Sequence, residues 1–139
     1  MDLRRDFMLP PDDEAFLNGY GCPWETIIAG QTRWVLLHEF WTRHEGYNVE
    51  RTTAAIRIET GYPKTALDMV WFYPALTRKD GKPIGATQAT ETIDGKAFQR
   101  WSRHRTQANP WIVNEDSLAS HIFLVEGWLL REFEMRGAA

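Results

Sequence analysis

Cysteine is almost absent from this chain, whose 139 residues contain a single one, Cys22. One thiol cannot form an intramolecular disulfide, and a structural zinc site built on several cysteines is excluded. No pair of histidines has the H-x-x-x-H or H-x-E spacing of a metal site. P-loop, GxGxxG and serine-elbow patterns are also missing. We therefore predict no metal and no cofactor. The four histidines are His38, His44, His104 and His121.

Long apolar runs and an excess of basic residues are missing as well. No run approaches the roughly 18 apolar residues that a membrane-spanning helix needs. The first residues, M-D-L-R-R-D-F, lack the apolar stretch of a secretory signal peptide. A formal net charge of −3 argues against general nucleic-acid binding, which usually requires a positive surface. The expectation is a cytoplasmic protein with neither a membrane nor a nucleic acid as its partner.

Aromatic residues, in contrast, are abundant, with seven Trp, seven Phe and four Tyr. A chain of this length forms one domain that buries about two thirds of its unfolded surface. We predict a single domain over residues 1–139, with a core from about 10 to 134 and flexible ends, including a tail at 137–139. Most aromatic rings are expected in the core, although seven tryptophans leave room for an exposed recognition surface.

Alternating polarity in the middle of the chain predicts an antiparallel sheet. A strand is predicted at about 49–59, because residues 54, 56 and 58 face one way and residues 55, 57 and 59 the other, which is the pattern of a half-buried strand. The sequence T-G-Y-P then ends the strand, and a second apolar run follows at 67–73. Two earlier strands are predicted at 24–28 and 33–41. Nearly continuous apolar residues in the 33–41 strand indicate that both of its faces are covered.

Helices are predicted on either side of this meander of about four strands. Prolines and acidic residues in P-P-D-D-E begin a short first helix, and glycines at 19 and 21 end it. Residues 77–114 are predicted to be a long loop with a tight Asp-Gly turn, and long loops are often functional. A longer helix follows, because an apolar stripe recurs at helical spacing. The stripe comprises Leu118, Ile122, Val125, Leu129 and Phe133. The fold class is therefore α+β.

This order of elements resembles the ubiquitin-conjugating fold (E2, or UBC-like). In that family the meander carries Y-x-G-G-x-F, I-x-F, Y-P and P-x-V-x-F in succession. Here E-G-Y-N-V, I-R-I, G-Y-P and L-D-M-V-W-F follow in the same order. W-I-V-N-E-D-S-L-A-S-H-I is similar to the segment that opens the helix after the E2 active site. The resemblance covers about residues 10–130 and extends to prokaryotic E2-like families. Those families occur beside bacterial ubiquitin-like proteins, E1-like adenylating enzymes and JAB-type peptidases, so it implies these three as partners.

The resemblance fails at the residue that a conjugating E2 needs most. The thiolate of an E2 accepts the ubiquitin-like C-terminus as a thioester, and a His-Pro-Asn motif shapes that site. By position, the cysteine belongs near residues 96–103, where this chain has K-A-F-Q-R-W-S-R. His-Pro-Asn is absent too. The resemblance therefore implies an E2-like component, a pseudoenzyme, that binds a ubiquitin-like protein or its E1-like partner without a standard catalytic cysteine.

Candidate binding residues gather in the loop that replaces the usual catalytic one. Arg103 and Arg105 are suited to grip a carboxylate or an acidic partner. Trp101 either stacks on the bound tail or packs inward as a core anchor. These residues, with His104 and Trp111, form the predicted binding site. Nucleic-acid binding through the same basic and aromatic residues is the less favoured interpretation.

Two alternatives to the pseudoenzyme remain open. The first is an active, non-standard E2 that uses Cys22 or a non-thiol acceptor such as Lys96, with His104 as a further catalytic candidate. Cys22 would need exposure and a lowered pKa, and it lies at the wrong place for an E2. The second is an α+β interaction module unrelated to ubiquitin chemistry. His121 is expected at the edge of the core, hydrogen-bonded, rather than as a general base.

Overall fold

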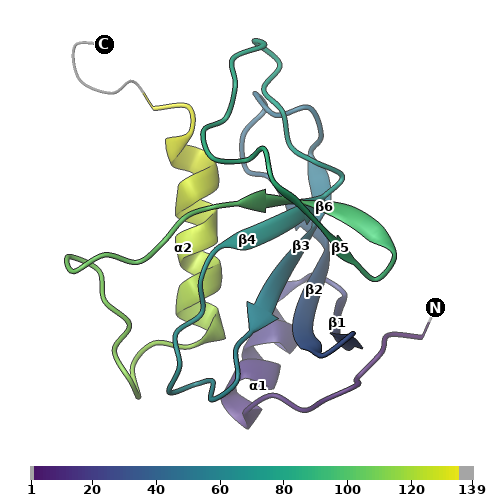
Figure 1. Cartoon of the computed structure of the whole chain (residues 1–139), viewed down its shortest axis with the longest axis vertical. Coiled ribbons are helices and arrows are strands. Elements are labelled where there is room, and N and C mark those ends of the chain that lie inside the picture. Colours follow the sequence, from purple (N-terminus) through teal and green to yellow (C-terminus); the bar gives the residue numbers. More distant parts are fainter. Residues whose placement is uncertain (1, 135–139) are drawn as a thin grey trace.

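The computed structural model describes residues 2–134 and is an α+β fold with two helices and one sheet (Figure 1). The elements are α1 (Pro11–Tyr20), β1 (Trp24–Ala29), β2 (Thr32–Trp41), β3 (Arg51–Ile58), β4 (Val70–Tyr73), β5 (Thr90–Ile93), β6 (Lys96–Trp101) and α2 (Leu118–Arg131). The strands are antiparallel in the order β1-β2-β3-β4-β6-β5. The short first helix, the longer last helix and an antiparallel meander are confirmed. The tail at 137–139 lies outside the described residues.

The predicted number of strands was wrong, because the sheet has six strands instead of about four. The two additional strands, β5 and β6, form a hairpin inside the segment predicted to be one long loop. Three of the four residues of β5 are polar and at least partly exposed at the sheet edge, so they carry no apolar alternation for a sequence reader to find. The turn predicted at Asp94-Gly95 is the turn of this hairpin, and both residues have positive φ, of 54° and 78°.

The strand predicted at 67–73 begins later, at Val70. Met69 has a φ of 59°, in the left-handed region, which is incompatible with a continuous strand. Leu67 nevertheless lies fully buried in the core. The apolar run is thus an irregular buried segment followed by a short strand. This break positions Asp68 within hydrogen-bond distance of His104.

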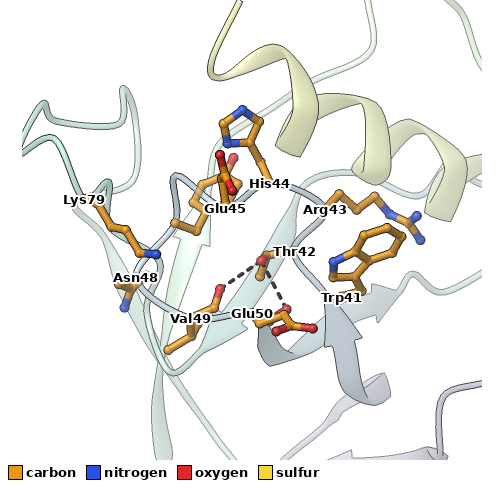
Figure 2. Close-up of a pocket in the computed structure, with 10 residues that line it drawn as sticks. Trp41, Thr42, Arg43, His44, Glu45, Asn48, Val49, Glu50 and Lys79 are labelled. Atoms are coloured by element: carbon orange, nitrogen blue, oxygen red, sulfur yellow. Dashed lines mark hydrogen bonds between the residues drawn. The ribbon is translucent and has the colours of Figure 1, made fainter.

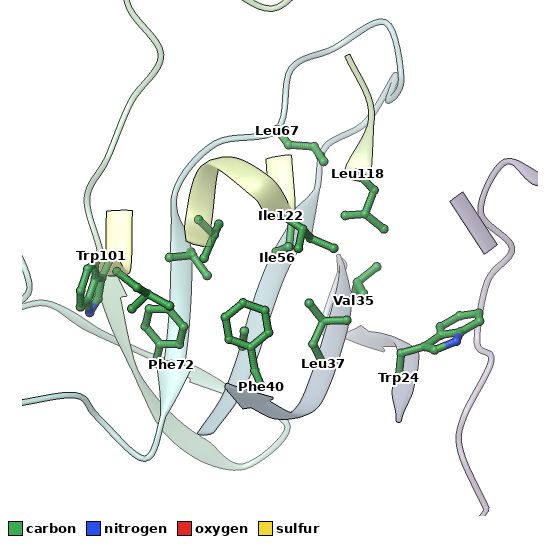
Figure 3. Packing of buried hydrophobic residues seen from close by; sticks show 14 of the residues in the cluster. Trp24, Val35, Leu37, Phe40, Ile56, Leu67, Phe72, Trp101, Leu118 and Ile122 are labelled. Atoms are coloured by element: carbon green, nitrogen blue, oxygen red, sulfur yellow. The ribbon is translucent and has the colours of Figure 1, made fainter. Parts of the chain in front are cut away.

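The main core lies between the sheet and α2, which crosses one face of the sheet (Figures 1 and 3). Alternate residues of the strands, such as Val35, Ile56 and Phe72, point toward the helix. The helix contributes Leu118 and Ile122 from its predicted apolar stripe, and both are fully buried. Burial of each such side chain contributes about 1.5–3 kcal/mol, so this layer is the principal source of stability.

A second, smaller core covers the other face of the sheet. Trp34 and Trp71 meet edge to face there, with ring centroids 4.8 Å apart. Ile93 and Phe98 of the hairpin pack onto the same cluster, so the sheet curls until its last strands cover the opposite face. This arrangement explains why β2 is apolar on both faces, and it confirms that prediction.

The N-terminal segment ties the two ends of the curled sheet together. The Arg4 guanidinium donates to Glu25 of β1, at 2.7 Å from Nε to Oε2, and to Asp94 of the hairpin turn, at 2.8 Å from Nη2 to Oδ2. Backbone bonds between Thr26 and residues 4 and 6 place this segment along the outer edge of β1. Within residues 2–134, neither helix has the length and hydropathy needed to cross a bilayer.

Candidate functional site

A carboxylate and an imidazole meet at one end of the paired strands β4 and β6. Asp68 precedes β4, and His104 follows β6, the strand paired with β4. His104 Nδ1 lies 2.7 Å from Asp68 Oδ2. The His104 side chain is 60% exposed and that of Asp68 is 34% exposed, so solvent reaches the pair. The other ring nitrogen of His104, Nε2, is not part of this bond.

Backbone contacts hold the two halves of this pair in register. The Met69 N–H donates to the Arg103 carbonyl at 3.2 Å, which extends the β4–β6 ladder by one irregular step. The buried His121 of α2 donates from Nε2 to the Met69 carbonyl at 2.8 Å. Burial lowers the pKa of His121 to about 4, so the ring is neutral and its donor nitrogen is fixed. His121 is therefore the hydrogen-bonded core residue that was expected, and it supports the segment that carries Asp68.

The pair lies on the rim of an open groove of about 440 Å³. The groove exists because β4 pairs only with residues 53–55, so the end of β3 has a strand partner on its β2 side alone. Its lining residues are mostly polar or charged, and Arg57 and Glu59 among them form an ion pair at 2.6 Å. They are Arg57, Glu59, Thr65, Ala66, Leu67, Asp68, His104 and Arg105.

Arg105 is held in place on this groove by an aromatic ring. Its guanidinium lies 4.9 Å above the centroid of Trp111, and its side chain is only 11% exposed. The Trp111 indole in turn donates to the Pro63 carbonyl at 3.0 Å. The nearest carboxylate oxygen of Asp116 is 3.8 Å away, which is a loose ion pair. Arg105 Nε is buried and has no hydrogen-bond partner among residues 2–134. The groove thus contains a cation that is rigidly positioned but incompletely paired.

The five predicted binding residues separate into two groups in the structure. His104, Arg105 and Trp111 lie together around the groove. Trp101, in contrast, is fully buried, and its indole donates to Gln99 Oε1 at 2.9 Å. Of its two predicted positions, Trp101 adopts the inward one. Arg103 lies over the Trp101 ring and donates to the Gly85 carbonyl at 2.9 Å, on a different side from Arg105.

The two candidate acceptors for a thioester or amide lie elsewhere. Cys22 is half-buried between α1 and β1, where its thiol donates weakly to the Glu39 carbonyl at 3.8 Å. Burial raises the pKa of Cys22, which opposes formation of the nucleophilic thiolate. Lys96 is exposed at the start of β6 and lines a separate cavity with Tyr73 and Phe98. Neither residue adjoins the groove.

Another cavity, at the connection between β2 and β3, is shown in Figure 2. Three of its side chains have structural partners. The Thr42 hydroxyl bonds to the Val49 carbonyl at 2.9 Å. Arg43 pairs with Glu126 of α2 at 2.7 Å. The His44 ring stacks on Phe133 at 3.9 Å. We therefore place the candidate functional site at the groove, where the exposed His104 and the incompletely paired Arg105 lie together.

Sequence reasoning missed Asp68, the partner of His104. The signal available was a single acidic residue inside the apolar run A-L-D-M-V-W, an unusual place for a carboxylate. Its pairing with His104 depends on the contact between β4 and β6. The sequence analysis predicted the segment that contains β6 to be a loop, so it did not predict this contact. Within residues 2–134, no group of three His, Cys, Asp or Glu side chains is arranged to hold a metal ion.

The fold and the groove define an α+β domain that has a helix-backed, curled antiparallel sheet. A family model described as Prokaryotic E2 family E matches residues 9–132, and the chain therefore belongs to this family. The predicted family is confirmed, and the single cysteine of the chain lies outside the 96–103 segment. Membership suggests a role in a ubiquitin-like pathway, and interaction in general with ubiquitin-like proteins and E1-like enzymes. No curated protein and no solved structure matched the chain.

Proposed function

We propose that this protein is a component of a bacterial ubiquitin-like modification pathway that binds the ubiquitin-like protein, its E1-like activating enzyme, or both, without forming a standard E2 thioester. The observation that carries the proposal is the under-paired Arg105 in the groove, in a chain of the E2-like family. The groove lies beside residues 96–103, the segment to which the sequence resemblance assigned the missing active site; most of this segment is strand β6 and not a loop.

The groove suits the C-terminal tail of a ubiquitin-like protein. Such a tail is an extended peptide that ends in a carboxylate, and a guanidinium binds a carboxylate through paired, charge-assisted hydrogen bonds. Ile112 and Val113, which follow Trp111, are 47% and 46% exposed and offer apolar surface next to it. Arg105 in the groove suits the terminal carboxylate of such a tail, and the apolar Ile112 and Val113 beside the groove suit its apolar side chains.

The state of Cys22 supports a role without a thioester. The thiolate, not the thiol, attacks an activated carbonyl, and burial keeps this thiol protonated. Arg43 and Arg51 oppose this shift but do not reverse it. Partnership with a JAB-type peptidase and a cytoplasmic location stay predictions from the sequence.

The proposal is tested by titrating the purified protein with a bacterial ubiquitin-like protein and its E1-like enzyme from the same organism. Calorimetry should detect binding to at least one of them. Arg105→Ala should weaken that binding about tenfold or more, since a charged hydrogen bond contributes about 1.5–3 kcal/mol. Gln107→Ala, an exposed change in the same loop, is the matched control and should bind normally.

Intact-mass measurement in the presence of ATP completes the test. We expect no covalent adduct of the ubiquitin-like protein on this chain. An adduct that disappears in Cys22→Ala would show an active E2 with a relocated nucleophile, and one on Lys96 would show a non-thiol acceptor. Absence of binding to both partners would overturn the proposed role.

A further inference from the structure

We infer that His104 acts as a general base for transfer of the ubiquitin-like protein from a thioester on a partner's cysteine to an amine, with Asp68 positioning the imidazole. This inference rests on the proposed function, since the groove must first receive the tail of the ubiquitin-like protein. It adds a catalytic step to a chain that cannot carry the thioester at the standard position. The thioester is supplied by the E1-like enzyme that activates the ubiquitin-like protein.

The carboxylate determines which nitrogen of His104 is basic. When His104 Nδ1 carries the ring proton, it donates that proton to Asp68 Oδ2 across 2.7 Å, and the lone pair then resides on Nε2. The exposed fraction of 60% leaves the ring accessible to a nucleophile. A carboxylate that orients an imidazole, on a ring that solvent reaches and with its second nitrogen outside that bond, is an arrangement suited to general-base catalysis.

The pair is more constrained than an ordinary surface ion pair. Three contacts fix the backbone next to it: Met69 to Arg103, His121 to Met69, and Arg103 to Gly85. Met69 adopts a left-handed φ of 59°, which is costly for a residue with a side chain. The two segments are therefore already joined without the side-chain pair, and exposed ion pairs contribute little to stability. The fold therefore does not depend on the Asp68–His104 contact, which is available for a functional role in the groove.

The rest of the groove supplies charge where the reaction needs it. Arg105 follows His104 in sequence, lines the same groove, and keeps a buried Nε without a hydrogen-bond partner in the described part of the chain. A cation there stabilises the oxygen that becomes negative when a nucleophile adds to a carbonyl. The other charged groups that line the groove around His104 are Arg57, Glu59 and Asp68.

The step balances without any further reactant. The nitrogen of a primary amine attacks the thioester carbonyl carbon, and His104 Nε2 takes a proton from that nitrogen. The carbon–sulfur bond breaks, and the sulfur leaves as the thiolate of the partner's cysteine. The imidazolium then returns the proton to that thiolate. The products are an amide of the ubiquitin-like protein and a free thiol.

The test is a single-turnover discharge assay with the purified thioester of the E1-like enzyme and free lysine as the amine. Wild-type protein should accelerate formation of the lysine amide, detected by intact mass. His104→Gln should lower that rate about 100-fold, the lower end of what general-base catalysis contributes. Gln107→Ala should discharge the thioester at the wild-type rate.

Asp68→Asn separates a positioning role from a merely structural one. It should slow discharge at saturating thioester without changing the concentration that gives half of the maximal rate, because an amide no longer selects the Nε2 lone pair of His104. Asp68→Glu, which keeps a carboxylate, should recover part of the rate. The melting temperature of both variants should stay at the wild-type value, which shows that they fold.

The failure of this inference is distinguishable from the failure of the proposed function. If wild-type protein binds its partner but does not accelerate discharge, or if His104→Gln discharges at the wild-type rate, the catalytic role is overturned and the binding role stands. If wild-type protein binds neither partner, both are overturned.

Discussion

The Tyr62 hydroxyl joins the two helices of the domain through Asp13. It donates to Asp13 Oδ2 of α1 at 2.5 Å and accepts the N–H of Leu118, the first residue of α2, at 2.7 Å. Asp13 is only 3% exposed, and burial raises its pKa. A single phenol thus contacts one buried carboxylate and one amide at the start of a helix.

Replacement of Tyr62 by Phe should destabilise the fold by about 1–3 kcal/mol, the cost of leaving buried polar groups without partners. Urea denaturation at neutral pH measures the change in the free energy of unfolding. Tyr73→Phe, at a tyrosine that is 39% exposed, is the matched control and should cost less than about 0.5 kcal/mol. Equal losses in the two variants would contradict this role for Tyr62.

His121 makes the stability depend on pH in the mildly acidic range. Its pKa is about 4 in the fold, below its ordinary value of 6.5, so the unfolded state binds more protons between these values. The contribution is therefore complete above about pH 6.5 and is lost as the pH falls toward 4, by up to about 3 kcal/mol. Unfolding free energies of wild type and His121→Gln across this range should differ in slope, and parallel curves would exclude His121 as the cause.

Glu25 should act in a separate and more acidic window. Its hydrogen bonds with Arg4, and the one with His38, lower its pKa from 4.5 to about 2. A carboxylate with a depressed pKa stabilises the fold above its unfolded pKa, and the gain is lost as the pH falls from about 4.5 to 2. Glu25→Gln should lose about 2 kcal/mol at pH 7 and show a flatter pH dependence below 4.5. An unchanged profile would show that Arg4 does not hold the sheet ends together through Glu25.

The two tryptophans of the predicted site should respond in opposite ways. Trp101→Ala removes a fully buried ring from the core and should cost about 3–5 kcal/mol of stability. Trp111→Ala should cost about 1 kcal/mol, and should weaken partner binding because Arg105 loses the ring that positions it. Melting curves of both variants measure the change in stability, and calorimetry measures their affinity for the partner. A Trp111→Ala protein with normal affinity would show that the groove is not the binding site.

The predictable part of this fold is the part with strong periodicity. The strand with Ala54, Ile56 and Ile58 and the helix with Leu118 and Ile122 bury one regular face each, so their apolar residues recur at the period of the structure. The β5–β6 hairpin was not predictable in this way. Its edge strand is mostly polar, and it is held by packing of Ile93 and Phe98 against tryptophans from distant strands. Such contacts leave no local pattern.

The candidate site was predictable only in its residue types. Arg105, His104 and Trp111 stood out as a basic and aromatic cluster, and the structure brings them to one groove. The cluster alone did not distinguish Arg105 from Arg103, because residues two apart share one face of a strand and their different sides arise in the irregular segment after β6. The role of Asp68 depended on strand pairing across 36 residues of chain, which no local spacing reveals.

The most direct test of the account is heteronuclear NMR of this protein during titration with the cognate ubiquitin-like protein. The indole N–H of Trp111 and the backbone amides of residues 65–68 and 104–113 should shift, whereas the indole of the buried Trp101 should stay in place. A version of the ubiquitin-like protein that lacks its C-terminal tail should leave these signals unchanged. Shifts confined to another surface, or equal shifts without the tail, would contradict binding of the tail in the groove of Arg105 and His104.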